Sequence, residues 1–253
     1  MSQDYLFFQD IDSDILFERN NHLIPSIKVR NIKEAINEFD RIMESFDKTE
    51  IPIAQILGLR NLSAFIGEVF NLAIARKSEN LLIQNPHQDG YPDLLVMDKD
   101  GETTFNNLAS RIKEKEPFSP FLQGGIEVKA TCGDIKSAKW FSENNLIKCS
   151  LGDERVDFVT NYNWKAHHRE TNNLMGLIWD FIDNKPRIVL ISYSSNLSIN
   201  DWGKTVVPKK NSRTTSVSIM NKDGISKMIN GRICMLRKPS YRVKLERNIK
   251  KYI

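Results

Sequence analysis

The chain has 253 residues, of which 40% are hydrophobic and 27% are charged, a composition typical of folded globular proteins. A chain of this length can bury a core that needs no disulfide or structural metal, and its three cysteines are isolated, which argues against a disulfide scaffold or a CxxC zinc site. No apolar run reaches the ~20 residues of a membrane span and no secretory signal follows Met1, so we expect a cytoplasmic protein with no membrane partner.

Two amphipathic helices are predicted in the first third of the chain. Asn31 has the character of a helix N-cap, with Glu34 three residues later, and apolar residues follow at helical spacing as far as Phe46. A second apolar stripe predicts a helix from about residue 57 to residue 77. Each helix has one apolar face, and we expect that face to be buried.

The pattern changes to that of β-strands after residue 90. Residues 93–97 are mostly apolar and end at a turn signal over residues 98–101, and residues 125–130 have strand composition with alternation. We expect two neighbouring strands here, joined by a long connection over residues 102–123 that is rich in charge and proline.

Further strands are predicted at residues 158–160 and 188–192, on either side of a helix at about residues 169–183. Residues 216–220 and 232–236 are also compatible with β-structure. Helices first, then mixed strands and helices, predict the α/β class with a central mixed β-sheet flanked by helices.

The charge is distributed unevenly along the chain. Its net value of +4 combines +12 in residues 202–253, the C-terminal basic block, with −8 in residues 1–201. Such a block can be a solvated face, a tail or a phosphate-binding surface. Because this block contains β-compatible stretches and aromatic residues, we expect much of it to fold against the rest and to be a candidate for nucleic-acid binding. No repeat or linker interrupts the sequence, so we expect a single domain over residues 1–253.

Three acids and one lysine stand out as candidates for chemistry. Glu68 lies in the second predicted helix, Asp93 opens a predicted strand, and Glu127 and Lys129 lie in the next strand. Side chains two positions apart on a strand point to the same side, so Glu127 and Lys129 share a face. Asp93 on the adjacent strand supplies a second carboxylate, and a divalent cation relieves the repulsion between two such groups.

These residues resemble the PD-(D/E)XK nuclease motif, in a context most similar to type II restriction endonucleases. Pro92 and Asp93 match the first half of the motif, and Glu127 and Lys129 match the second half. Glu68 matches the acid that many members carry on a helix upstream. Apolar residues after the aspartate and within the ExK strand make the match more specific than its letters alone.

The resemblance, which covers about residues 60–135, implies a Mg²⁺-dependent phosphodiesterase with a restriction-endonuclease-like core and extra elements for DNA recognition. It implies that Asp93 and Glu127 bind the metal, that the carbonyl of Val128 helps, and that Lys129 orients or activates the attacking water.

The resemblance also implies a biological setting. We expect a sequence-specific endonuclease for double-stranded DNA, acting as a homodimer because twofold symmetry gives each strand of a palindrome its own active site. The catalytic core is expected at about residues 55–195 and a DNA-facing segment at about residues 202–253. A prokaryotic cytoplasm and a possible cognate methyltransferase acting on the same site follow from the same resemblance.

Each of these residues also has a plainer interpretation. Asp93 alone suits a turn, Glu127 and Lys129 suit a solvated ion pair on a strand, and Glu68 suits an exposed helix position. The four residues together favour the catalytic interpretation.

Candidate DNA contacts lie in two segments. Residues 203–216 hold four basic side chains, no acid and many short hydrogen-bonding side chains. Lysines and hydroxyls commonly bind phosphates, whereas arginine and asparagine suit the edges of guanine and adenine. The candidates are Lys204, Lys209, Lys210, Asn211, Arg213, Thr214 and Thr215, together with His168 and Arg169 at the start of the predicted helix over residues 169–183. A basic surface hairpin and a polar helix cap are the alternatives.

Two other functions remain open from the sequence. The first is a structure-specific repair or junction-cleaving nuclease of the same fold. The second is a DNA-binding protein in which the acids are structural and no cleavage occurs.

Overall fold

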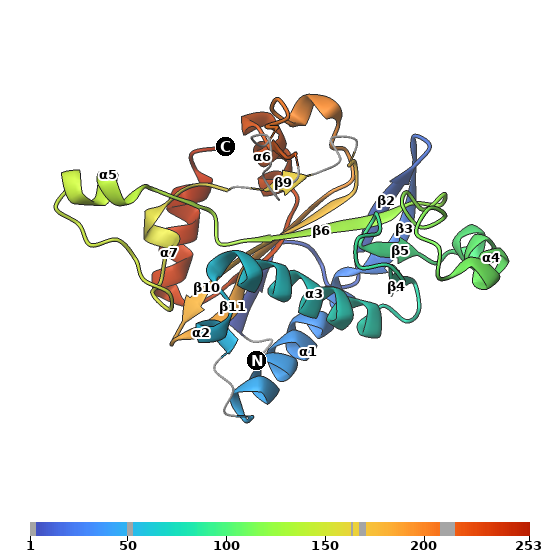
Figure 1. Cartoon of the computed structure of the whole chain (residues 1–253), viewed down its shortest axis with the longest axis horizontal. Coiled ribbons are helices and arrows are strands. Elements are labelled where there is room, and N and C mark those ends of the chain that lie inside the picture. Colours follow the sequence, from blue (N-terminus) through green and yellow to red (C-terminus); the bar gives the residue numbers. More distant parts are fainter. Residues whose placement is uncertain (1–3, 50–52, 163, 167–170, 208–215) are drawn as a thin grey trace.

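The computed structural model describes residues 4–49, 53–162, 164–166, 171–207 and 216–253. A seven-stranded sheet runs through its middle in the order β1-β13-β11-β10-β6-β5-β4 (Figure 1). Neighbouring strands are antiparallel except β6 and β10, which are parallel. The strands are β1 (Tyr5–Phe7), β4 (Leu82–Gln84), β5 (Leu94–Val96), β6 (Gly125–Thr131), β10 (Leu174–Ile182), β11 (Lys185–Ser194) and β13 (Arg232–Leu236).

Helices cover both faces of this sheet. A Cβ atom at Gly67 of α3 would lie 3.8 Å from the Cβ atom of Ala130 on β6. Gly176 of β10 pairs with Lys129 and faces the other way, and a Cβ atom there would lie 2.8 Å from Met228 of α6. The predicted α/β class with a mixed, helix-flanked sheet is confirmed. The longer helices are α1 (Val29–Asp47), α3 (Leu59–Lys77), α4 (Lys99–Asn107), α6 (Lys222–Asn230) and α7 (Pro239–Ile249).

Smaller elements complete the described part of the chain. Two-stranded ladders are formed by β2 with β3, by β7 with β8, and by β9 with β12. Their bounds, with those of the short helices, are β2 (Asp14–Arg19), β3 (His22–Lys28), β7 (Asp134–Ile135), β8 (Val159–Asn161), β9 (Lys165–Ala166), β12 (Ser218–Ile219), α2 (Ile53–Ile56), α5 (Ala138–Glu143) and the 3₁₀ turns Ala109–Arg111, Val156–Phe158 and Ile199–Asp201.

The first predicted helix is present as α1, but its N-cap was predicted at the wrong residue. Lys28 is the N-cap, and Asn31 lies within the first turn, where its Oδ1 accepts a hydrogen bond from the amide of Lys28 at 2.8 Å. Asn31 Nδ2 also donates to the carbonyl of Lys77 at 2.7 Å. An asparagine inside the first turn can thus bond to a backbone amide at the helix terminus, as an N-cap side chain does. The predicted N-cap, Asn31, is therefore three residues after the observed one, Lys28.

The second predicted helix is present as α3, and the strands β5 and β6 are neighbours as predicted. The turn signal at residues 98–101 is instead the start of α4, because the Asp98 carboxylate caps it by accepting from the amide of Gly101 at 3.0 Å. The connection over residues 102–123 therefore contains helical structure that the sequence analysis missed.

The helix predicted at about residues 169–183 is wrong, because β10 occupies Leu174–Ile182 and all nine of its residues are buried. A strand covered on both faces shows a continuous apolar run instead of alternation, and periodicity cannot distinguish such a run from a buried helix. Asp183 and Asn184, both with positive φ, form the two-residue turn into β11.

The described part of the C-terminal basic block is folded against the rest of the chain, as predicted. Its strand β13 pairs with β1 and β11 within the main sheet. Helix α6 buries Ile225 and Met228, and α7 buries Tyr241 and Leu245. The block therefore contributes to the same core as the rest of the chain.

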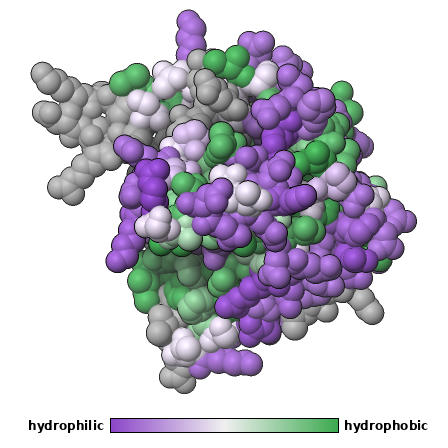
Figure 2. Space-filling view, turned by 90° about the vertical axis from the view of Figure 1, so that its right-hand side faces the viewer, coloured by the Kyte–Doolittle hydropathy of each residue, from purple (hydrophilic) through white to green (hydrophobic). Residues whose placement is uncertain are grey.

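Figure 2 shows one face on which hydrophilic residues predominate, with a hydrophobic area towards its lower left. Within the described ranges, none of the helices combines the length and apolarity that crossing a membrane requires.

Candidate active site

The position of Asp93 is fixed by a close crossing of two strands. Asp93 immediately precedes β5, whose residues Leu94 and Leu95 pair with the first two residues of β6. A Cβ atom at Gly125 would lie 1.9 Å from the carbonyl oxygen of Leu94 and 2.6 Å from the Pro92 ring. Only glycine therefore allows β5 to approach the start of β6, and this approach holds Asp93 beside β6.

The beginning of β6 is buried, although it carries charge. Ile126 and Val128 are buried, as predicted, but Glu127 is also buried, with 7% of its side chain exposed. The side chain of Lys129 is 25% exposed and that of Asp93 is 20% exposed. Charges in such a position are costly unless they have partners.

Asp93, Glu127 and Lys129 form one cluster, which we name the carboxylate–lysine cluster. The ammonium of Lys129 donates to the Glu127 carboxylate and lies 3.9 Å from Asp93 Oδ2. The amide of Val128 donates to the same Asp93 oxygen at 2.8 Å. The structure thus brings together the three residues that the motif singles out.

The cluster contains more negative than positive charge. Burial, and then the neighbouring charge of Glu127, raise the pKa of Asp93 to about 7, although Lys129 and the Val128 amide act in the opposite direction. Burial lowers the pKa of Lys129, but the charges of Glu127 and Asp93 outweigh it and raise that pKa above its ordinary value. Lys129 is therefore protonated, and the two carboxylates share a single ammonium.

One carboxylate oxygen of the cluster has no partner. Glu127 Oε2 is buried and accepts no hydrogen bond from any described residue. A buried, unpaired carboxylate oxygen next to a second carboxylate is a suitable environment for a divalent cation. Within the described ranges, no group of three or more His, Cys, Asp and Glu side chains is arranged to hold a metal. Mg²⁺ commonly uses only one or two carboxylates, with water and substrate phosphates as its other ligands, so the pair Asp93 and Glu127 fits it.

Glu68 reaches the same region from α3. It lines a cavity of about 310 Å³ together with Asp93, Val128 and Lys129. Burial and the charge of Asp93 raise the pKa of Glu68. Glu68 is exposed, so it lies at the solvent-facing rim of this cavity.

Three residues near the cluster were not predicted from the sequence. Tyr91 Oη donates to Thr171 Oγ1 at 3.1 Å, and the pKa of Tyr91 is raised by burial and by the charge of Glu127. Asn71, one turn after Glu68 on α3, lines the cavity, and its buried Oδ1 has no hydrogen-bond partner among the described residues. The spacing of three residues between Glu68 and Asn71 was the available signal for Asn71, whereas Thr171 is brought close only by the tertiary fold.

Most of the predicted DNA contacts lie outside the described residues: His168, Arg169, Lys209, Lys210, Asn211, Arg213, Thr214 and Thr215. Lys204 is described and exposed. The described residues that flank these positions are close to one another, because Ala166 of β9 pairs with Ser218 of β12. Thr171 accepts a hydrogen bond from Tyr91, which lies two residues before Asp93.

Many cations of the C-terminal basic block have acidic partners elsewhere in the chain. Lys244 lies 2.9 Å from Glu154 and 3.4 Å from Asp157, and Lys227 lies 2.8 Å from Asp201. Arg247 also pairs with Asp157. The excess charge of +12 therefore overstates the positive charge that this block presents to a ligand.

Comparisons of this chain with protein-family models, with curated proteins and with solved structures found no match.

Proposed function

We propose that the protein is a Mg²⁺-dependent endonuclease that hydrolyses phosphodiester bonds at a specific site in double-stranded DNA, as the PD-(D/E)XK resemblance implies. The observation that carries the proposal is the composition of the carboxylate–lysine cluster. Two carboxylates share one protonated lysine, and one oxygen of Glu127 has no partner. A purely structural ion pair in this position has no need of the second carboxylate.

Asp93 and Glu127 would hold the cation, with the carbonyl of Val128 as a further oxygen ligand. Bound there, Mg²⁺ would supply positive charge against the negative charge that develops on the phosphate and would make a nearby water more acidic.

Lys129 acts as a positive group that orients the attacking water and stabilises the transition state. It is not the base, because the neighbouring carboxylates keep it protonated. Glu68 has a raised pKa and lines the cavity, so it is the carboxylate that takes the proton of the water. The water oxygen bonds to phosphorus as the bond from phosphorus to the leaving sugar oxygen breaks.

DNA recognition would use the exposed Lys204 and the basic segment that follows it. A homodimer would cut both strands of a twofold-symmetric site, and a methyltransferase acting on the same site would protect the host DNA.

The test is incubation of the purified protein with plasmid DNA and Mg²⁺. We expect discrete fragments, no cutting in EDTA, and no cutting by Asp93→Ala. Asp89→Ala is the matched control, since Asp89 is an exposed aspartate four residues upstream, and it should cut as the wild type does. Cutting of branched junctions alone would support the structure-specific nuclease, and a mobility shift without cutting would support the non-catalytic DNA-binding protein. Cutting by Asp93→Ala at the wild-type rate would reject the proposed site.

A further inference from the structure

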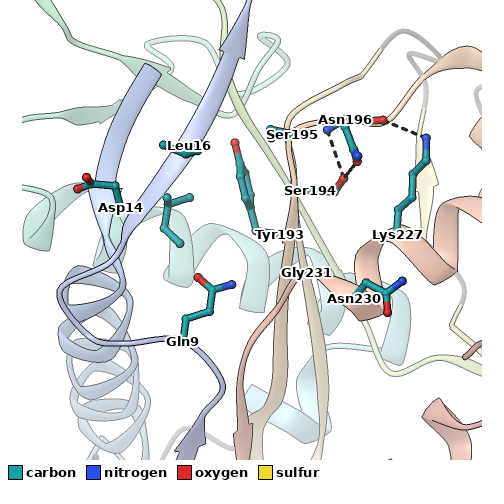
Figure 3. Close-up of a pocket in the computed structure, with 11 residues that line it drawn as sticks. Gln9, Asp14, Leu16, Tyr193, Ser194, Ser195, Asn196, Lys227, Asn230 and Gly231 are labelled. Carbon is teal, nitrogen blue, oxygen red and sulfur yellow. Dashed lines mark hydrogen bonds between the residues drawn. The ribbon is translucent and has the colours of Figure 1, made fainter. Parts of the chain in front are cut away.

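A second cavity lies at the same end of the sheet as the carboxylate–lysine cluster. This polar pocket has a volume of about 400 Å³, within the range of small-ligand sites. Figure 3 shows Leu16 of β2 on one side, Asn196, Lys227 and Asn230 on the other, and Tyr193 of β11 between them.

Strand pairing places the polar pocket near the cluster. Glu127 of β6 pairs with Leu174 of β10, and Leu174 pairs with Ser194 of β11, which lines the pocket. Neighbouring strands are 4.7–4.9 Å apart, so the backbones of Glu127 and Ser194 are about 10 Å apart. This separation corresponds to about three steps of 3.4 Å along the axis of a DNA strand.

Asn173 connects the two sites directly. Its carbonyl oxygen accepts from the amide of Glu127 at 3.0 Å. Its side-chain Oδ1 accepts from Tyr193 Oη at 3.1 Å. Tyr193 lines the pocket, so a ligand there would contact the side chain that bonds to Asn173, the residue whose carbonyl holds the amide of Glu127.

The charges of the polar pocket are matched. The Lys227 ammonium donates to the Asp201 carboxylate at 2.8 Å and to the carbonyl of Asn196 at 3.0 Å. The carboxylate of Asp14 lies 3.4 Å from the ammonium of Lys28. Among the described residues that line it, the pocket thus has no unmatched cation for a phosphate, and its hydrogen-bonding groups are mostly neutral.

The pocket combines apolar and polar walls. Leu16 is 40% exposed and offers an apolar contact. On the opposite wall, Ser194 Oγ donates to Asn196 Oδ1 at 2.7 Å, and the side chains of Ser195 and Asn230 form no hydrogen bond with any described residue. A nucleobase has this combination of an apolar face and a polar edge.

We infer that the polar pocket binds a single nucleobase, supplied by the DNA strand near the position of cleavage after that base has left the stack. The inference rests on the proposed function for the source of the base. Proteins that take a base out of the duplex hold it by hydrogen bonds to its edge and by contacts to its faces, and both kinds of group line this pocket.

The first experiment needs no cleavage. Binding of four single-stranded homo-oligonucleotides, one for each base, is measured by fluorescence anisotropy for the wild type, Asn230→Trp, Asn230→Ala and Asn107→Trp. Asn230 ends α6 at an exposed position, so a tryptophan there fills the pocket without entering the core. Asn107 is an exposed asparagine of α4 that does not line the pocket, and it serves as the matched control.

We expect the wild type to prefer one base, Asn230→Trp to bind that oligonucleotide about tenfold more weakly, and Asn230→Ala to lose most of the preference. Asn107→Trp should behave as the wild type. If Asn230→Trp, folded as judged by its melting temperature, binds all four oligonucleotides as the wild type does, the inference is wrong, even if plasmid cleavage supports the proposed function. If the base preference depends on Asn230 but no DNA is cut, the pocket inference stands and the proposed function fails.

A second arm identifies the source of the base. Duplexes with 2-aminopurine at successive positions are bound by Asp93→Ala, and a rise in fluorescence that Asn230→Trp abolishes identifies a base drawn from the duplex. Competition by a free nucleoside monophosphate, with no such rise at any position, would overturn DNA as the source and identify a mononucleotide ligand.

Discussion

Asp180, which is buried, and Asp93, which is mostly buried, show opposite solutions to the same electrostatic problem. Burial is the largest cause of a raised pKa in both. The carboxylate of Asp180 accepts hydrogen bonds from the amides of Arg155, Val156 and Phe181 and from the hydroxyl of Tyr241, at distances of 2.8–3.1 Å. Asp93 accepts one amide hydrogen bond and faces a second carboxylate.

The difference indicates what each residue is for. Asp180 ties β10 to the segment around Arg155 and to α7, so its buried charge is offset by donors from three parts of the chain. The cluster around Asp93 has too few donors for its charge, a state that costs stability and that a ligand of opposite charge would relieve. A fold that satisfies Asp180 so fully could satisfy Asp93 as well, so we interpret the imbalance at Asp93 as functional.

The largest expected effect is on cleavage by Asp93→Asn. Removing one of the two carboxylates proposed to bind the cation removes several kcal/mol of transition-state stabilisation, so the single-turnover rate should fall about 10³-fold or more. The melting temperature in EDTA should be unchanged or higher, because a repulsive charge has been removed. An Asp93→Asn variant that cuts normally, or that unfolds, would contradict the interpretation that Asp93 serves cleavage and not the stability of the fold.

Asp180→Asn should have the reverse profile. It leaves amide donors without a charged acceptor in the core, and we expect a loss of about 3 kcal/mol in the free energy of unfolding. Cleavage per folded molecule should be unchanged. Urea unfolding measures the stability, and cleavage rates normalised to the concentration of folded protein measure the activity. A cleavage defect in fully folded Asp180→Asn would show that Asp180 is not purely structural.

Glu68→Gln should slow cleavage by about a hundredfold while leaving DNA affinity unchanged, because it removes the proposed proton acceptor and keeps the shape of the side chain. The wild-type rate should fall as the pH is lowered through the raised pKa of Glu68, and Glu68→Gln should lose that part of the pH dependence. Glu34→Gln, at an exposed position on α1, is the control. A slower Glu68→Gln with an unchanged pH profile would assign Glu68 to the support of the cavity instead.

The stability of the metal-free protein should fall as the pH rises. The pKa of Asp93 is about 7 in the folded state and 3.8 ordinarily, so the folded state holds the proton more tightly. Its stabilising contribution is complete below about pH 4 and is lost as the pH rises through 7, by up to about 4 kcal/mol.

Asp93→Asn isolates this effect from that of Asp180, whose pKa is shifted in the same direction. Unfolding of the wild type and of this variant in EDTA, at pH 5 and at pH 8, should show the difference, and Mg²⁺ at pH 8 should stabilise the wild type alone. Equal pH dependence in the two proteins would remove Asp93 as its cause.

The sequence predicted the parts of the fold whose pattern is local. The apolar stripe of α3 and the alternation of Gly125–Thr131 were sufficient to locate the Glu68 helix and the ExK strand. The strand Leu174–Ile182 was predicted as a helix because burial on both faces removes the alternation that identifies a strand. Its pairing with β6 is a property of the tertiary fold, and so is the contact of Thr171 with Tyr91.

Two lysines of the C-terminal basic block differ in the same way, one with acidic partners and one without. Lys244 is paired with Glu154 and Asp157 and lies 4.8 Å from the ring centre of Tyr241. Lys204 is exposed and makes no ion pair with any described residue. Of the two, only Lys204 is therefore available for a DNA phosphate.

Lys204→Ala should weaken binding to cognate and scrambled duplexes alike and should reduce the slope of log affinity against log salt by about one unit, as expected for one lost phosphate contact. Lys244→Ala should leave that slope unchanged and cost less than about 1 kcal/mol of stability, since its partners are partly exposed. Binding isotherms at several salt concentrations measure both slopes. The opposite result, a reduced slope for Lys244→Ala and an unchanged slope for Lys204→Ala, would show that a lysine with acidic partners can still bind DNA in this protein. The DNA-binding surface would then lie along α7 instead of beside the β9–β12 ladder.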